Sequence, residues 1–73
     1  MEKVMEILKR VRPDVDFTTG ANLIEDGILD SVDVVAIVSE IEDEFNISIE
    51  MEYIQPGYFQ SPEAIWGMIE EHL

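Results

Sequence analysis

The sequence predicts a small all-α protein: a four-helix bundle with three major helices, one short helix and a long loop between the first two helices. Three segments carry apolar residues at helical spacing, near residues 2–11, 30–46 and 61–73. No run of strand-like alternation competes with them. The chain of 73 residues is predicted to form one domain, 1–73, close to the size at which a single core just suffices.

The first helix is predicted from about Glu2 to Val11. Proline cannot continue a helix, so Pro13 ends it. Basic residues near its end complement the negative end of the helix dipole. Its apolar residues lie at i, i+3, i+4 and i+7 and form one stripe: Val4, Ile7, Leu8 and Val11.

A long connection rich in Asp, Thr, Asn and Gly follows, from residue 12 to residue 30. Loops of this length are uncommon in compact domains unless they have a function or are packed. Gly20 and Gly27 supply turns. Six apolar residues are predicted to anchor the loop to the core: Val15, Phe17, Leu23, Ile24, Ile28 and Leu29.

The second helix begins at Asp30 or Ser31 and ends near residue 45 or 46. If Asp30 is the N-cap, Leu29 and Val34 occupy the positions of a hydrophobic staple. Asp33 then stands at N3 of a capping box, and Ser31 is the first helical residue, with a free hydroxyl. If Ser31 is the cap instead, its oxygen accepts a hydrogen bond from the amide of Val34. The staple and box residues favour Asp30.

This second helix has more apolar surface than one core-facing stripe requires. The core stripe is predicted to contain Val34, Ile37, Val38, Ile41 and Phe45. A second line of small or apolar residues consists of Val32, Val35, Ala36 and Ser39. Either the helix is central and buried on two sides, or this second line is a binding surface bordered by carboxylates.

Between the second and last helices, residues 50–54 are predicted to form the short helix, followed by a turn at Pro56-Gly57. The last helix has a strong start signal, with Ser61 as N-cap and Pro62 at the first helical position. Gly67 lies inside this helix and costs about 1 kcal/mol relative to alanine. Close packing is the predicted reason for it.

The formal net charge is −13, and the charges are segregated along the chain. All four basic residues lie in the first twelve positions, and every acidic residue except Glu2 and Glu6 follows Pro13. Such a surface repels nucleic acid and anionic membranes and favours basic protein partners. Solubility alone is the competing explanation.

Cysteine is absent, and no apolar run approaches the length of a membrane span. We therefore expect a soluble, cytoplasmic protein without a thiol of its own. An enzyme is not predicted, because a catalytic Ser31 needs a base and the only histidine, His72, lies next to the C-terminus. No metal site is expected, since the ligand spacing of a calcium loop is missing.

From Asn22 to Phe45 the chain reads NLIEDGILDSVDVVAIVSEIEDEF and resembles the acyl carrier protein family. The attachment motif of that family is an Asp-Ser pair followed by an apolar residue and Asp, at the start of a helix that becomes acidic. Residues 30–33 match it. The resemblance implies a four-helix bundle in which Ser31 accepts phosphopantetheine from coenzyme A. The terminal thiol of that arm would hold cargo as a thioester.

The resemblance also implies partner contacts. Asp30 and Asp33 would help a phosphopantetheinyl transferase to recognise its target. The expected partners beyond it are a loading ligase and a downstream synthase or transferase with basic patches. The residues that would face them are Val32, Val35, Ala36 and Glu40. We expect a freestanding monomer that binds no nucleic acid.

The sequence leaves alternatives open for the cargo and for the class of the protein. The cargo is a fatty or polyketide acyl chain, or an amino acid such as D-alanine, because Gly27-Ile28-Leu29-Asp30 resembles D-alanyl carriers. The long loop is expected to help open a cavity between helices for an acyl chain. A protein of another class, an acidic interaction module that is never modified, would keep all activity in Ser31→Ala.

Overall fold

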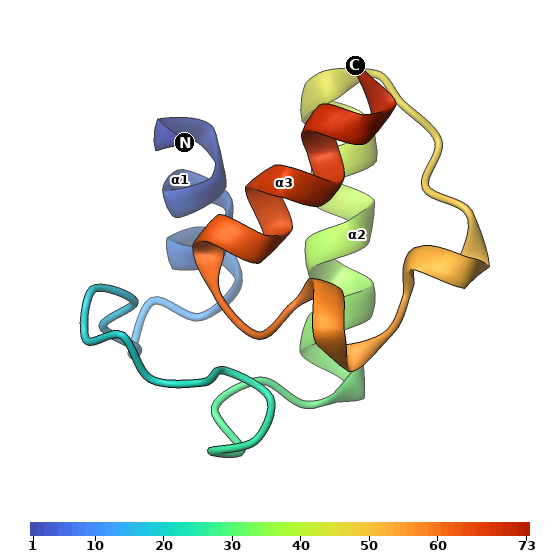
Figure 1. The fold of residues 1–73 in the computed structure, drawn as a ribbon. Helices are drawn as coiled ribbons and strands as arrows, with labels where there is room; N and C mark the ends of the chain where they lie inside the picture. The colour runs from blue at the N-terminus through green and yellow to red at the C-terminus, as the bar shows by residue number, and fades with distance from the viewer.

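The computed structural model describes residues 1–73 and contains three α-helices and no strand. Helix α1 spans Glu2–Val11, α2 spans Ser31–Phe45 and α3 spans Pro62–His72. Figure 1 shows the long loop at one end of the bundle, where α1 ends and α2 begins. The all-α prediction and the three major helices are confirmed. No helix combines the length and the apolar character that crossing a bilayer requires.

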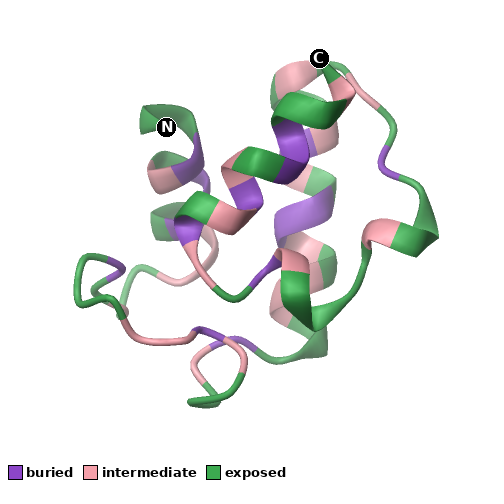
Figure 2. Ribbon diagram, in the orientation of Figure 1, coloured by how far each residue is buried: buried purple, intermediate pink, exposed green.

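The core is built only from apolar side chains, contributed by all three helices and by the loops. Figure 2 shows the buried positions on the sides of the helices that face the bundle interior. Helix α1 packs against both α2 and α3, and the core stripe predicted for α2 is confirmed, because its central residues are buried and its ends are half-buried. Burial of each large side chain stabilises the fold by about 1.5–3 kcal/mol. The most deeply buried large side chains include Ile7, Leu8, Ile37, Ile41, Phe59, Ile65 and Ile69.

The long loop between α1 and α2 is packed against this core. Phe17, Leu23 and Leu29 are buried, and the other three predicted anchors are half-buried against them. The backbone amide of Leu23 donates to the carbonyl of Gln60 at 2.8 Å, which ties the loop to the segment before α3. The predicted anchors are therefore confirmed, and the loop holds the start of α2 in a defined place.

The fourth, short helix is not present as an α-helix. Two 3-10 turns take its place: η1 at Met51–Tyr53 and η2 at Pro56–Tyr58. In η1 the amide of Tyr53 donates to the carbonyl of Glu50 at 2.9 Å, three residues back. The pyrrolidine ring of Pro56 disfavours helical backbone in the residue before it, and Gln55 is extended, with φ −135° and ψ 152°. The segment is therefore too short for α-helical hydrogen bonding before it is interrupted.

Two turn glycines and one helical glycine behave differently. Gly20 and Gly27 have φ of +79° and +71°, in the left-handed region that favours glycine, so their role in turns is confirmed. Gly67 in α3 has no atom within 4 Å of the position that a Cβ would occupy. The prediction that close packing requires Gly67 is wrong, because its side of α3 faces solvent.

Candidate functional site

The start of α2 is organised by two aspartates that cap each other's backbone. The carboxylate of Asp30 accepts a hydrogen bond from the amide of Asp33 at 2.9 Å. In return, the carboxylate of Asp33 accepts from the amide of Asp30 at 3.2 Å. Both halves of a capping box are present, with Asp30 as N-cap in extended backbone. This confirms the assignment of Asp30, rather than Ser31, as the cap.

Ser31 is the first residue of α2 and is exposed to solvent. Because Asp30 supplies the oxygen that caps α2, the hydroxyl of Ser31 does not accept the capping hydrogen bond. The first backbone amides of a helix lack intrahelical acceptors and give its N-terminus a partial positive charge. A reactive oxygen at this position is accessible, and an attached anion would be stabilised there by about 0.3–1 kcal/mol.

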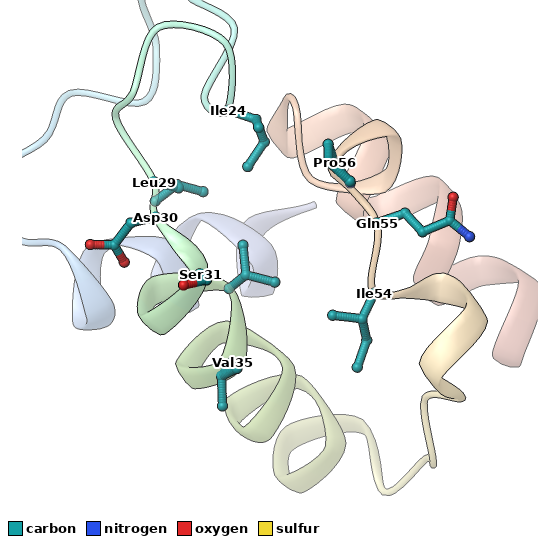
Figure 3. Close-up of a pocket in the computed structure, with 9 residues that line it drawn as sticks. Ile24, Leu29, Asp30, Ser31, Val35, Ile54, Gln55 and Pro56 are labelled. Atoms are coloured by element: carbon teal, nitrogen blue, oxygen red, sulfur yellow. The ribbon is translucent and has the colours of Figure 1, made fainter.

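An apolar cavity of about 290 Å³ adjoins Ser31. It lies between the start of α2, the end of the long loop and the segment that connects η1 to η2 (Figure 3). The carboxylate of Asp30 and the amide of Gln55 point away from this gap on opposite sides, so its walls are mainly hydrocarbon. The apolar residues that line it are Ile24, Leu29, Val34, Val35, Ile54 and Pro56.

The second line of small residues on α2 faces outward. Val32 is 73% exposed and Val35 is 62% exposed, which is unusual for two large apolar side chains on one helix. Ala36 is half-buried and Ser39 is exposed. Of the two interpretations of the extra apolar surface, burial of α2 on both sides is therefore wrong, and a solvent-exposed apolar face remains.

Comparison with known proteins identifies the family. The family described as phosphopantetheine attachment site matches residues 1–55, from α1 through η1. The chain belongs to this family of carrier domains. Its members hold a phosphopantetheine prosthetic group, attached covalently to a serine, and depend on a phosphopantetheinyl transferase and on the enzymes that use the carrier. No curated protein and no solved structure matches the chain.

The start of α2 fits the phosphopantetheine group of such a carrier. An exposed hydroxyl is available on Ser31, and the helix N-terminus favours the phosphodiester that attachment would create. The cavity beside it offers an apolar surface. The other hollow along α2 has no apolar side chain in its wall, which consists of Ser39, Glu40, Glu42 and Asp43.

Three ion pairs join α1 and its C-cap residue, Arg12, to one side of α2, and none of them was predicted from the sequence. Their acidic members, Asp33, Glu40 and Glu44, lie at i, i+7 and i+11 and therefore share one face. The basic members run in the opposite order along α1, as expected for antiparallel helices. The nitrogen–oxygen distances are 2.8 Å for Arg12–Asp33, 2.9 Å for Arg10–Glu40 and 3.7 Å for Lys3–Glu44.

Because of these ion pairs, the residues predicted to face partners do not all lie on one open surface. Glu40 is engaged by Arg10 at the border with α1, whereas Val32 and Val35 are open to solvent. Asp33 is turned inward, with only 15% of its side chain exposed. The acidic stripe at 33, 40 and 44 was a signal in the sequence that could have identified the face of α2 covered by the basic α1.

Arg12 has the densest set of contacts near Ser31. Hydrogen bonds to the carboxylates of Asp14 and Asp33 raise the pKa of the Arg12 guanidinium. The same contact with Arg12 lowers the pKa of Asp14 below its usual value. Both effects favour the charged forms, so the contact is ionic at neutral pH.

His72 lies in the last turn of α3, where its Nδ1 is 2.9 Å from the carbonyl oxygen of Met68. Its ring packs edge-on against Tyr53, with centroids 4.7 Å apart. These contacts agree with its prediction as a residue of the helix end. Trp66 is half-buried and packs near Phe45, with ring centroids 6.1 Å apart.

Proposed function

We propose that Ser31 is the serine that carries phosphopantetheine, and that the chain is an acyl carrier. The family match contains three serines, Ser31, Ser39 and Ser48. Ser39 lies in the middle of α2 and Ser48 lies in the segment after it. Ser31 alone combines a helix N-terminus, a capping residue other than itself and an adjoining apolar cavity. That combination is the observation on which the assignment depends.

The attachment reaction follows from this placement. The Ser31 oxygen attacks the coenzyme A phosphorus that is bonded to the pantetheine unit. A new oxygen–phosphorus bond forms as the bond from that phosphorus to the adenosine 3′,5′-bisphosphate leaving group breaks. The hydroxyl proton passes to a base on the transferase, because no side chain of this chain accepts a hydrogen bond from the Ser31 hydroxyl. Once bound, the group supplies a terminal thiol, which the chain itself lacks, since it contains no cysteine.

The partner surface is proposed to be the exposed outer face of α2. Val32 and Val35 supply apolar contact area, and Ala36 lies beside them. Asp30 is exposed just before this area, and Glu40, Glu42 and Asp43 line a hollow beyond it along α2, so a partner with an apolar floor and basic residues beside it fits this face. Glu40 belongs to the border, but a basic residue of the partner has to compete with Arg10 for it.

We propose one carrier domain over residues 1–73, because α3 contributes Ile65, Met68 and Ile69 to the same core as α1 and α2. We also propose an apolar acyl cargo of short or medium length. Ligand cavities commonly measure about 300–1,000 Å³, and the one beside Ser31, at about 290 Å³, is at the lower limit of that range. An aminoacyl cargo would place an ammonium group against hydrocarbon walls, which is unfavourable without a partner.

The attachment is tested by intact mass after incubation with coenzyme A and a phosphopantetheinyl transferase of broad specificity. Wild type and Ser39→Ala are expected to gain one phosphopantetheine, and Ser31→Ala none. A carrier of known activity verifies the transferase. Wild type that gains nothing would contradict the proposal and favour an interaction module that is never modified. Gain by Ser31→Ala would move the attachment site elsewhere.

The cargo is tested by loading the modified chain with a hexanoyl group or with D-alanine and recording methyl spectra. We expect the hexanoyl form to shift the methyl signals of Ile24 and Ile54, which line the cavity. The methyls of Ile7 on α1 serve as the internal control. Equal shifts with D-alanine, or none with hexanoyl, would contradict an apolar cargo held at this cavity.

A further inference from the structure

A single arginine connects the three segments that meet near Ser31. Nη1 of Arg12 donates to the carboxylate of Asp33 at 2.8 Å and to the carbonyl of Ile28 at 2.9 Å. Its Nε and Nη2 donate to the two carboxylate oxygens of Asp14 at 3.1 Å and 3.0 Å. The guanidinium therefore joins the end of α1, the end of the long loop and the first turn of α2.

The acceptor on α2 is also part of the capping box. The same Oδ2 atom of Asp33 that receives the Arg12 hydrogen bond accepts from the amide of Asp30. Ser31 stands between these two aspartates in the chain. The backbone geometry of Ser31 thus depends on a capping box whose N3 residue, Asp33, is held by an arginine from outside the helix.

We propose that Arg12 is a positioning residue for phosphopantetheine attachment. Through Asp33 and the Ile28 carbonyl, it fixes both sides of the turn that presents the Ser31 hydroxyl. The inference rests on the proposed role of Ser31 as the attachment site. It gives Asp33 a function within the molecule, in contrast to the contact with the transferase that the sequence resemblance implies.

The chemistry of the contact requires arginine. A planar guanidinium directs donors to several acceptors at once, and here it meets two carboxylates and one carbonyl. A lysine ammonium is a compact charge and cannot hold all three in this geometry. The Arg12–Asp33 part of the contact is partly buried, because the Arg12 side chain is 31% exposed and the Asp33 side chain 15%, whereas Asp14 is open to water with 65% of its side chain exposed.

Arg10 provides a matched control. It also joins α1 to α2 by an ion pair, with Glu40 at 2.9 Å. That pair lies two turns further along α2 and touches neither the long loop nor the capping box. Loss of either arginine removes one positive charge and one interhelical pair, but only loss of Arg12 releases the turn at Ser31.

The test is a steady-state measurement of phosphopantetheine transfer to wild type, Arg12→Gln, Arg12→Lys and Arg10→Gln. Small misplacements of reacting atoms lower rates strongly, so we expect kcat to fall about tenfold in both Arg12 variants with KM changed less than about twofold. Arg10→Gln is expected to keep the wild-type kcat. An unchanged kcat in the Arg12 variants, or a loss confined to KM, would overturn the proposal, because the latter indicates docking.

Amide hydrogen exchange tests the positioning without any transferase. The Asp33 amide, which donates to Asp30, is expected to lose protection about tenfold in Arg12→Lys, while the Ala64 amide at the start of α3 keeps it. Arg12→Lys retains the charge, so it serves if Arg12→Gln does not fold. Unchanged protection of Asp33 would overturn the inference. A wild type that is never modified would instead refute the role of Ser31, and the exchange result would stand separately.

Discussion

Two helices of this protein have a serine at their N-terminus, and the two serines have opposite roles. At α3, Ser61 is the N-cap, and its Oγ accepts a hydrogen bond from the amide of Ala64 at 3.0 Å. At α2, Asp30 is the N-cap and Ser31 is the first helical residue. The hydroxyl is thus used for capping at α3 and left free at α2.

The difference shows how a helix start becomes a site of chemistry. A capping serine stabilises the helix but hides its oxygen in a backbone hydrogen bond. An aspartate in the preceding position takes over capping and leaves the next hydroxyl exposed, at the positive end of the helix dipole. The α2 start also has a second support that α3 lacks, because Arg12 bonds to Asp33 from α1.

The largest expected effect separates the two serines. Ser31→Ala should abolish phosphopantetheine attachment and change the free energy of unfolding by less than about 0.5 kcal/mol. Ser61→Ala should remain a full substrate of the transferase and lose about 1 kcal/mol, because it removes a cap. Intact mass and urea unfolding measure the two properties. Loss of attachment in a folded Ser61→Ala variant would contradict the separate roles assigned to the two serines.

The second effect concerns the residue that frees Ser31. Asp30→Ala should cost about 1 kcal/mol of stability, and Asp30→Asn only a few tenths, because asparagine caps equally well. In Asp30→Ala the serine hydroxyl can take over capping, so attachment should also slow relative to Asp30→Asn. Transfer rates and thermal melting provide the check. Equal rates in the two variants would show that the cap does not control access to Ser31.

A third, smaller effect should come from α3 and leave attachment untouched. Gly67→Ala is expected to raise stability by about 0.5–1 kcal/mol, because alanine has the higher helix propensity and the added methyl meets open space. Attachment to Ser31 should proceed at the wild-type rate. Urea unfolding measures the gain. Destabilisation would indicate that the Gly67 side of α3 is packed against something after all.

The smallest effect is pH dependence, since the groups involved are exposed. Hydrogen bonds from Arg12 lower the pKa of Asp14, so its contribution to stability is present above about pH 3.9 and is lost as pH falls through the lowered value. A hydrogen bond and charge repulsion from Glu50 raise the pKa of Glu52. Ionisation of that pair therefore costs stability above about pH 4.3, and acid relieves it.

The melting temperature should accordingly rise slightly as pH falls from neutral through the raised pKa of Glu52 toward about pH 4.3, and fall below about pH 4. Asp14→Asn should weaken the fall and Glu52→Gln should weaken the rise. Hydrogen bonds from Thr18 lower the pKa of Asp16 as well, so Asp16 contributes to the same acid limb and Asp14→Asn should remove only part of the fall. The Ser61 cap at α3 does not titrate and contributes nothing to it. A melting temperature that is flat over both ranges would contradict these assignments.

Local signals explain why the three helices could be predicted from sequence. Pro13 ends the first helix, the Asp30 box begins the second and Ser61-Pro62 begins the third, and each acts within a few residues. The short fourth helix was not confirmed as an α-helix for an equally local reason, since Pro56 restricts the backbone of the residue before it. The free hydroxyl of Ser31 also followed from local spacing, because staple and box residues identified the cap.

Contacts between distant residues could not be predicted in the same way. Arg12 and Asp33 are 21 residues apart, and Arg10 and Glu40 are 30 apart. Helical periodicity gives the face on which a residue lies but not which helix covers it. The inward orientation of Asp33 therefore had to come from the structure. The exposure of Val35 was one of two alternatives that the sequence left open, and the structure decided between them.

The role of Ser31 as the attachment site is tested by locating the modification on the unaltered chain. Wild type is modified with coenzyme A and a phosphopantetheinyl transferase, digested, and its peptides are fragmented to place the added group. We expect the whole gain in mass to reside on Ser31, with Ser39, Ser48 and Ser61 unmodified. A group found on any of those three serines, or a chain that gains nothing, would contradict it.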